Sequence, residues 1–179
     1  MTETFALSRP ISVTDVAPDG QTVAFEADAE EREALAAAFN LSSIESLAAD
    51  FEVKPWRGDG LSVAGTVTAV VVQPCVVSLA PVRQTISEEL YLRFMPETKV
   101  RKGNGEIDID PGGEDPPELF DGESLDLGAI AAEHVALGID PYPRVPGAQF
   151  DPVEEGDEEE DEEPSPFAVL ERLKRGGGQ

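Results

Sequence analysis

The chain has 179 residues, with 37 Asp and Glu against 13 Lys and Arg, and a formal net charge of −24. This balance argues against a protein that coats nucleic acid or attaches to an anionic membrane, because both tasks draw on clustered basic residues. Hydrophobic residues make up 40% of the chain, which is enough for a packed core. We see no secretory signal, no apolar run near the ~20 residues of a membrane span, and only one Cys, so the expected compartment is the cytoplasm.

The acidic excess is uneven along the chain. Residues 1–102 hold 15 acids and 9 bases, residues 103–143 hold 11 acids and no base, and residues 144–179 hold 11 acids and 4 bases. A loop rich in Gly, Pro and acids is expected near 97–123. Ten acids without a base between 151 and 163 are typical of a disordered segment. We therefore predict a single domain over 1–150 and a disordered acidic tail over 151–179 that ends in a short amphipathic segment.

In the N-terminal part, alternating residues predict a strand at 4–8 and a second strand at 22–26 after the Asp19-Gly20 turn, and the two are expected to pair as a hairpin. Asp28 stands three residues before Glu31, as in a capping box, so a helix is expected over 29–39. Ser42 or Ser43 is expected to cap a further short helical turn.

The centre of the chain favours strands. Apolar and polar residues alternate at 51–54 and 85–94, and the segment 61–72 between them is rich in Val and Thr. These predicted strands follow one another without long crossovers, which indicates an antiparallel sheet. Segment 61–72 carries apolar residues on both faces and is expected to be a central strand covered on both sides. Asp126 is a good N-cap for a last helix that ends before Pro141. The predicted class is α+β, an antiparallel sheet, open or partly closed into a barrel, with about two packed helices.

Candidates for catalysis or metal binding are few. The single histidine, His134, falls near the apolar face of the last helix and is interpreted as structural. One Cys and one His cannot make a Cys/His zinc site. The stretch that begins at Asp108 departs from a calcium loop at its fifth and twelfth positions. A nuclease that uses the carboxylates of residues 106–126 to hold metal ions is a less favoured alternative to the binding functions described below. We predict no catalytic residue, no metal and no cofactor.

Two charged segments are candidates for binding. A cluster of bases beside aromatic residues is a possible RNA contact: Arg83, Tyr91, Arg93, Lys99, Arg101 and Lys102. The alternative interpretation is an edge strand that its charges keep soluble. The acidic tail, with Glu158, Glu159, Glu160 and Asp161, is a possible contact for a basic partner, and it can also compete with RNA for the basic cluster.

The segment Gln73-Pro74-Cys75-Val76-Val77-Ser78-Leu79-Ala80-Pro81-Val82 resembles the YceD family, the large ribosomal RNA subunit accumulation proteins. Further segments agree in the same order along the chain: Val63-Ala64-Gly65, Ile86-Ser87-Glu88, Asp126-Leu127-Gly128, Asp140-Pro141-Tyr142-Pro143-Arg144, Pro146-Gly147-Ala148 and Pro166-Phe167-Ala168-Val169-Leu170. The positions that carry the resemblance most clearly are Cys75, Leu79, Pro81, Val82, Pro141, Tyr142 and Arg144.

The resemblance implies a non-enzymatic cytoplasmic factor of ribosome biogenesis, linked to synthesis, processing or stability of 23S ribosomal RNA. The partners it implies are a basic large-subunit ribosomal protein, 23S rRNA, or both, and neither DNA nor a membrane. A direct RNA-binding module that uses the cluster at 83–102 is the alternative. Many family members carry a second Cys three residues after the first, where this chain has Ser78, so no role of a Cys pair is carried over. Cys75 is expected to be a packed residue at a strand end.

Overall fold

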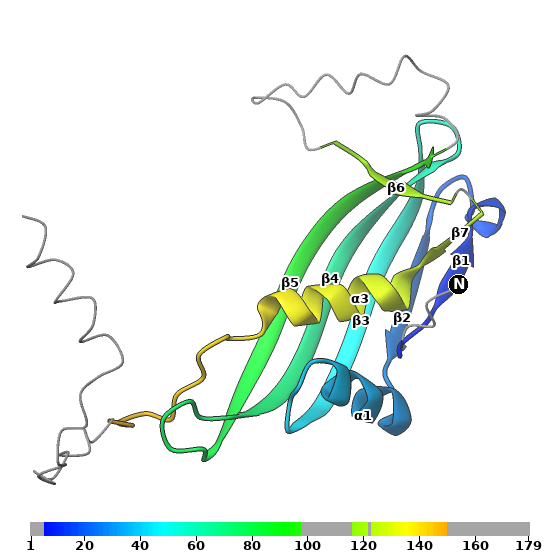
Figure 1. Cartoon of the computed structure of the whole chain (residues 1–179). Coiled ribbons are helices and arrows are strands. Elements are labelled where there is room, and N and C mark those ends of the chain that lie inside the picture. Colours follow the sequence, from blue (N-terminus) through cyan, green and yellow to red (C-terminus); the bar gives the residue numbers. More distant parts are fainter. Residues whose placement is uncertain (1–5, 98–115, 122, 150–179) are drawn as a thin grey trace, which may run out of the picture. The chain divides into compact units, whose positions relative to one another are not determined.

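The computed structural model of the chain describes residues 6–97, 116–121 and 123–149. Its elements follow one another along the chain as Figure 1 shows. They are β1 (Pro10–Ser12), the 3-10 turn η1 (Val13–Asp15), β2 (Gln21–Glu26), α1 (Ala29–Ala38), β3 (Ser43–Trp56), β4 (Gly60–Pro74), β5 (Pro81–Pro96), β6 (Glu118–Phe120), β7 (Ser124–Asp126) and α3 (Leu127–Gly138).

In the described part of the chain, five strands form one sheet in the order β2-β3-β4-β5-β6. The pairs from β2 to β5 are antiparallel, and β6 lies parallel to β5. A separate pair joins β1 to β7 in antiparallel register. The α+β class with two helices and a mostly antiparallel sheet is confirmed. The expectation of a partly closed barrel is not met, because β2 and β6 are the two edges of an open sheet.

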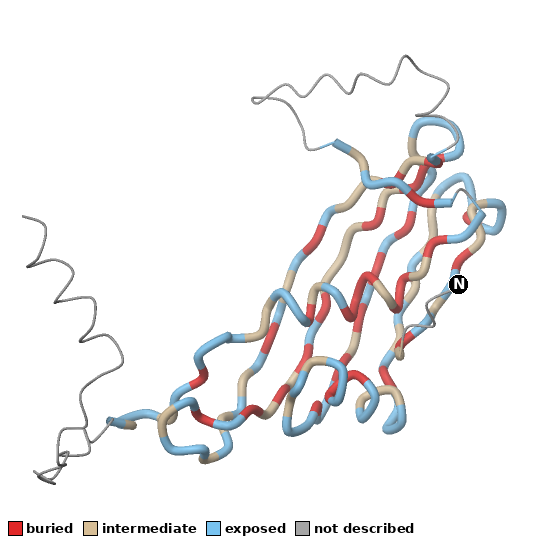
Figure 2. Tube along the Cα trace, in the orientation of Figure 1, coloured by how far each residue is buried: buried red, intermediate tan, exposed pale blue. Residues whose placement is uncertain are grey.

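The core lies on one face of this sheet, which α3 crosses in Figure 1. Burial alternates along the long strands, as the red segments of Figure 2 show, because successive side chains point to opposite faces. Leu35 of α1 and Leu127 of α3 belong to the same core cluster as the inward strand residues. The inward strand residues include Leu47, Phe51, Val53, Leu61, Val63, Val67, Val71, Ile86, Leu90 and Phe94.

The other face of the sheet is open, and the prediction that segment 61–72 is covered on both sides is therefore wrong. Ala64, Thr66, Val70 and Val72 of β4 are only half-buried, while their neighbours of opposite parity, such as Val67, are fully buried. Both helices pack into the one core cluster, so nothing in the described residues lies over the second row of β4. Valine and threonine in that row follow strand preference and do not indicate burial.

Two N-terminal predictions are also wrong. Among the described residues, 6–8 form no strand and do not pair with 22–26 as expected: β2 pairs with β3, and the first described strand starts at Pro10 and pairs with β7. The expected helical turn after Ser42 is instead the start of β3, since Ile44 is buried in the core and Ser43 pairs with Val72 of β4. In both segments the structure is set by pairing with strands distant in the sequence, which the local spacing of residues does not show.

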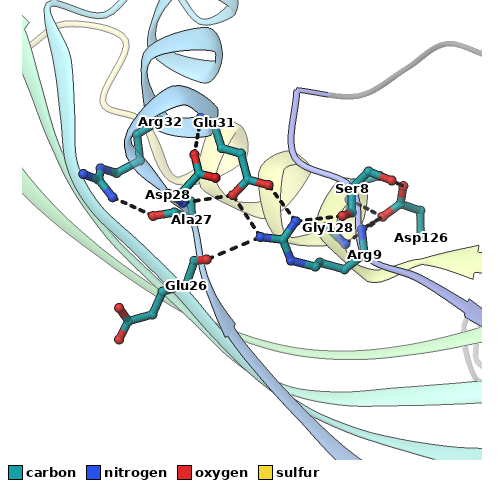
Figure 3. A network of polar contacts seen from close by, with 10 residues as sticks. Ser8, Arg9, Glu26, Ala27, Asp28, Glu31, Arg32, Asp126 and Gly128 are labelled. Atoms are coloured by element: carbon teal, nitrogen blue, oxygen red, sulfur yellow. Dashed lines mark hydrogen bonds and ion pairs between the residues drawn. The ribbon is translucent and has the colours of Figure 1, made fainter.

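The start of α1 is fixed by the predicted capping box, which is confirmed. The Asp28 carboxylate accepts the Glu31 N–H at 2.9 Å, and the Asp28 N–H donates to Oε2 of Glu31 at 2.9 Å. Glu31 also accepts two hydrogen bonds from Arg9, at 2.6 and 2.9 Å, in the fork-to-fork geometry shown in Figure 3. This pairing with Arg9 holds the pKa of Glu31 below its usual range.

Asp126, the predicted N-cap of α3, is confirmed and joins two distant parts of the chain. Its Oδ1 accepts the N–H groups of Gly128 and Ala129 at 2.9 and 3.2 Å, which caps the helix. The same oxygen accepts the Arg9 N–H at 2.7 Å, and Oδ2 accepts the Ser8 hydroxyl at 2.6 Å (Figure 3). A Cβ at Gly128 would lie 2.8 Å from the Leu7 carbonyl oxygen, so a glycine is needed where the backbone of residues 7–9 passes the start of α3. Arg9 therefore links α1 to α3 through Glu31 and Asp126.

Candidate nucleic-acid interface

The open face of the sheet is arranged in rows of side chains that run across the strands. The antiparallel register sets these rows, because residues opposite each other point to the same face. One row holds Lys54, Ser62 and Arg93, the next holds Thr22, Glu52, Ala64 and Tyr91, and the third holds Ala24, Asp50, Thr66 and Glu89. The face therefore changes from basic and aromatic at one end to acidic towards its middle.

We call the basic end of this face the basic platform and define it as Lys54, Trp56, Arg57, Tyr91 and Arg93. The Arg93 guanidinium lies 5.5 Å from the centroid of the Trp56 ring and 5.8 Å from that of the Tyr91 ring. The Arg57 guanidinium lies 4.6 Å from the Trp56 ring. Each pair is within the ~6 Å at which a cation is attracted to a ring face. These contacts join two of the platform's three cations, Arg57 and Arg93, to its two rings.

The turn between β3 and β4 places Arg57 over Trp56. Arg57 and Gly58 both have positive φ angles, 43° and 83°, as tight hairpin turns require. Glycine adopts this conformation freely, whereas an arginine there is strained, by about 1–2 kcal/mol. The turn ends at Gly60, where a side chain would not fit: a Cβ there would lie 2.5 Å from the Trp56 carbonyl oxygen and 2.6 Å from the Phe94 carbonyl oxygen. The turn Arg57-Gly58-Asp59-Gly60 thus fixes one edge of the platform.

Charge and exposure on the platform are suited to a ligand that carries both rings and phosphates. Tyr91 is 64% exposed, so the face of its ring is available to a partner. Lys54 contacts the Glu52 carboxylate at 2.7 Å, an exposed pair that contributes little to stability. Arg83, by contrast, lies ten residues before Arg93 on β5, about 33 Å away at the rise of an extended strand.

The structure brings together two of the six predicted RNA-contact residues, Tyr91 and Arg93. Arg83 lies towards the other end of β5, where its Nε donates to Glu45 at 2.7 Å. Lys99, Arg101 and Lys102 lie outside the described residues, as do the four acids of the tail, Glu158, Glu159, Glu160 and Asp161. Residues that the sequence did not single out complete the platform: Lys54, Trp56 and Arg57. Their signal was the basic turn next to the chain's one tryptophan.

At the far end of β4 and β5, the residues that carry the family resemblance meet around Cys75. Cys75 is fully buried just after β4, as expected for a packed residue at a strand end. Its Sγ accepts the N–H groups of Val77, Ser78 and Val145 at 3.4–3.5 Å. Val76 donates its N–H to the Pro143 carbonyl at 2.9 Å. The loop after β4 is thereby tied to the segment that follows α3.

Hydrogen bonds to the sulfur change the chemistry of this thiol. The Ser78 side chain, which stands where many family members have a second Cys, and the backbone N–H of Val145 lower the pKa of Cys75 to about 6. Burial acts in the opposite direction, and the N–H groups of Ser78 and Val77 add to the lowering. A thiolate accepts these donors better than a thiol does. The arrangement stabilises a negative sulfur inside the loop.

The remaining positions of the resemblance divide into structural and exposed residues. Pro81 and Val82 begin β5, opposite Pro74 and Gln73 of β4, and Pro141 is exposed where the chain leaves α3. Leu79 and Tyr142 are 78% and 72% exposed, and Arg144 is exposed as well. Leu79 also adopts a positive φ of 60°, which is unusual for a leucine. These three side chains are free of any packing role in the described part of the chain.

No group of three or more His, Cys, Asp or Glu among the described residues is placed to hold a metal ion. The carboxylates around Asp108, considered above for calcium or for a nuclease, lie outside those residues. His134 is half-buried on α3. Neither α1 nor α3 is long and apolar enough to cross a membrane, and no other described helix is.

The chain was compared with protein families, curated proteins and solved structures. The family model described as "Large ribosomal RNA subunit accumulation protein YceD" matches residues 63–174, which is more than half of the chain. The chain belongs to the YceD family. The match spans most of β4 and all of β5, β6, β7 and α3, and it includes Cys75, Tyr91, Arg93 and Tyr142. Lys54, Trp56 and Arg57 precede it. No curated protein and no solved structure is significantly similar to the chain.

Membership of the YceD family connects this chain with the accumulation of the large-subunit ribosomal RNA. The family description does not say which molecule a member binds.

Proposed function

We propose that this YceD-family protein is a non-enzymatic, cytoplasmic factor of ribosome biogenesis that contacts 23S ribosomal RNA through the basic platform. The observation that carries the proposal is the cluster of Trp56, Arg57, Tyr91 and Arg93, in which two guanidinium groups lie 4.6–5.8 Å from ring centroids on an open sheet face. RNA offers the two chemical groups that such a surface binds, since bases stack on exposed rings and phosphates pair with Lys and Arg.

The expected strength of this contact is modest. Stacking of one base on an aromatic side chain contributes about 1–3 kcal/mol, and each neutralised phosphate adds a salt-dependent amount. The acidic remainder of the chain opposes any wider contact with RNA, since the net charge is −24. The function that fits is an accessory contact to particular elements of the rRNA during synthesis, processing or protection, and not a general coat.

A second candidate function is the binding of a basic large-subunit ribosomal protein. It is favoured by a depression of about 410 Å³, whose lining includes two carboxylates, those of Glu26 and Asp50. The other lining residues are Ala24, Phe25, Ala48, Ala49, Thr66 and Thr68. A Lys or Arg side chain of a partner would pair with these carboxylates. The acids of the tail, Glu158 to Asp161, remain a predicted contact for the same kind of partner.

A comparison of two arginines on β5 tests the rRNA contact. Arg93→Gln removes a platform charge, and Arg83→Gln removes the same charge from the other end of the strand. We expect the purified full chain to bind fragments of 23S rRNA in a filter-binding assay, and Arg93→Gln to weaken this binding by several-fold. The slope of log affinity against log salt should fall by about 0.7–0.9 for a lost phosphate contact.

Arg83→Gln is the matched control and should leave affinity and salt slope unchanged. Equal loss in both variants would show that the binding depends on total charge and would contradict the platform. If the wild-type chain binds no rRNA fragment but retains a basic large-subunit protein in a pulldown, the second candidate replaces the first. The loss of that retention in Asp50→Asn would assign it to the depression.

A further inference from the structure

The acidic row beside the basic platform limits what kind of RNA can lie on it. Asp50 of β3 and Glu89 of β5 both stand opposite Thr66 of β4, so the two carboxylates flank one small side chain on the open face. This row is two residues along the strands from the row of Tyr91, a spacing of about 7 Å. That distance is shorter than the Debye length of about 10 Å at 0.1 M salt, so the carboxylates repel phosphates placed over the platform's inner edge.

The platform itself presents one accessible stacking surface. Tyr91 stands opposite Ala64, whose methyl group leaves the neighbouring space on the sheet low and open. Tyr91 is 64% exposed and has one guanidinium group, that of Arg93, 5.8 Å from its ring centroid, while the Trp56 ring lies close to two, those of Arg57 and Arg93. A base can stack on Tyr91 only if it is not already stacked and paired within a helix.

Cations surround this ring on one side only. Lys54 and Arg93 share the row next to Tyr91, and Arg57 lies at the turn beyond it. The Glu52 carboxylate stands in the row of Tyr91 itself and pairs with Lys54 at 2.7 Å. A single RNA strand that crosses the sheet along the row of Lys54 and Arg93 can keep its phosphates near these cations and away from Asp50 and Glu89. An RNA duplex centred over Tyr91 is wider than the spacing of about 7 Å between the two rows, so one of its phosphate strands would lie over Asp50 and Glu89.

We propose that the basic platform binds a short unpaired RNA element, with one base stacked on Tyr91, and that Asp50 and Glu89 exclude duplex RNA. The inference rests on the proposed function and specifies the class of RNA that the platform takes. The two carboxylates then make binding selective, because they lower the affinity for unpaired RNA slightly and the affinity for duplex RNA strongly.

Binding of fluorescently labelled RNA, followed by anisotropy at 0.1 M salt, tests this inference. The two probes are an unpaired hexanucleotide and a blunt duplex that contains the same sequence. The wild-type full chain should bind the hexanucleotide at least tenfold more tightly than the duplex. Tyr91→Leu should weaken hexanucleotide binding by about tenfold, in line with the loss of one stacked base, while Tyr91→Phe should stay within about twofold.

Removal of the acidic row provides the second measurement. The double variant Asp50→Asn/Glu89→Gln should raise duplex affinity by tenfold or more and hexanucleotide affinity by less than threefold. The control variant Glu33→Gln/Glu133→Gln removes the same charge from exposed positions on α1 and α3, which pack on the covered face. It should raise both affinities equally and slightly. At 0.5 M salt the preference of the wild-type chain should shrink, since the repulsion is screened.

Three results would overturn the inference: equal wild-type binding of both probes, equal effects of Tyr91→Leu and Tyr91→Phe, or an acidic-row variant that behaves as the α1/α3 control does. In each of these cases the proposed rRNA contact still stands if Arg93→Gln weakens binding and Arg83→Gln does not. If the wild-type chain binds neither these probes nor the rRNA fragments, the proposed function fails together with the inference. Circular dichroism and melting temperature confirm that each variant is folded.

Discussion

Replacement of Asp126 with alanine is expected to destabilise the protein more than the loss of an ordinary helix cap. The two Asp N-caps of the described helices offer a direct comparison. Asp28 accepts one exposed N–H, from Glu31, whereas Asp126 accepts two N–H groups of α3 together with the Arg9 N–H and the Ser8 hydroxyl. The first interaction is local, and the last two join residues 117 and 118 positions apart.

The magnitude follows from these contacts. Loss of an N-cap costs about 1 kcal/mol, which is the expected effect of Asp28→Ala. In Asp126→Ala the part-buried Arg9 N–H also loses a charged acceptor at 2.7 Å, which costs about 1.5–3 kcal/mol more. The exposed Ser8 contact adds little. The total is about 3 kcal/mol, which corresponds to a fall of about 6–12 °C in melting temperature for a domain of this size.

Thermal and urea unfolding followed by far-UV circular dichroism measures the difference. Asp126→Asn keeps a capping oxygen and should lose about 1 kcal/mol, which separates the charge from the cap. The reasoning is refuted if Asp126→Ala and Asp28→Ala are equally stable within about 0.5 kcal/mol, because Asp126 would then act only on its own helix.

Three further predictions concern Cys75, Gly65 and the two faces of β4. Because the folded-state pKa of Cys75 is lowered from 9.0 to about 6, the stability that its thiolate contributes is complete above pH 9 and is lost as pH falls through 6. The stability difference between wild type and Cys75→Ala, from urea unfolding under reducing conditions, should therefore grow from pH 6 to pH 9; a constant difference would contradict the hydrogen-bonded thiolate. Gly65→Ala would bring a Cβ into overlap with a backbone carbonyl oxygen of β3 and should prevent stable folding, whereas Gly147→Ala, at φ 81° in open space, should cost only about 1 kcal/mol in the same assay. Val67→Thr places a hydroxyl in the core and should cost about 1–3 kcal/mol, while Val70→Thr on the open face should cost less than about 0.5 kcal/mol; equal losses would show that the open face is covered in solution.

Local signals in the sequence predicted α1 and α3 correctly, although they also predicted a helical turn after Ser42 that is part of β3. The capping box at Asp28 and Glu31 and the N-cap at Asp126 depend on residues within one helical turn, so sequence spacing shows them directly. β4, β5 and the second half of β3 were predicted for a similar reason, since apolar residues alternate with polar ones in β3 and β5 and Val and Thr are frequent in β4. The covered face could not be deduced for segment 61–72, because small apolar residues occupy both rows and only the position of the helices distinguishes them.

The platform was only half predictable. Tyr91 and Arg93 are two residues apart on one strand, so their shared face follows from strand geometry alone. Trp56 and Arg57 reach them through the registers of β3 with β4 and of β4 with β5, which no local pattern specifies. Arg83 is separated from the platform by the length of β5, since ten residues of extended strand lie between it and Arg93. The family resemblance, by contrast, was recognisable from short motifs, and the match over residues 63–174 confirms it.

The order of the elements along the chain has a consequence for protein synthesis. Strands β2 to β5 are complete once residue 96 has left the ribosome, but α3, which packs on the apolar face of β4 and β5, is complete only at residue 138. Synthesis adds about 5–20 residues per second, so the residues of β4 that are buried in the finished fold, such as Val67 and Val71, remain uncovered for about 2–8 s. We expect a chaperone to cover the nascent chain during this interval. Limited proteolysis of ribosome-bound chains stalled before and after α3 would measure it, and equal resistance in both would exclude such a delay.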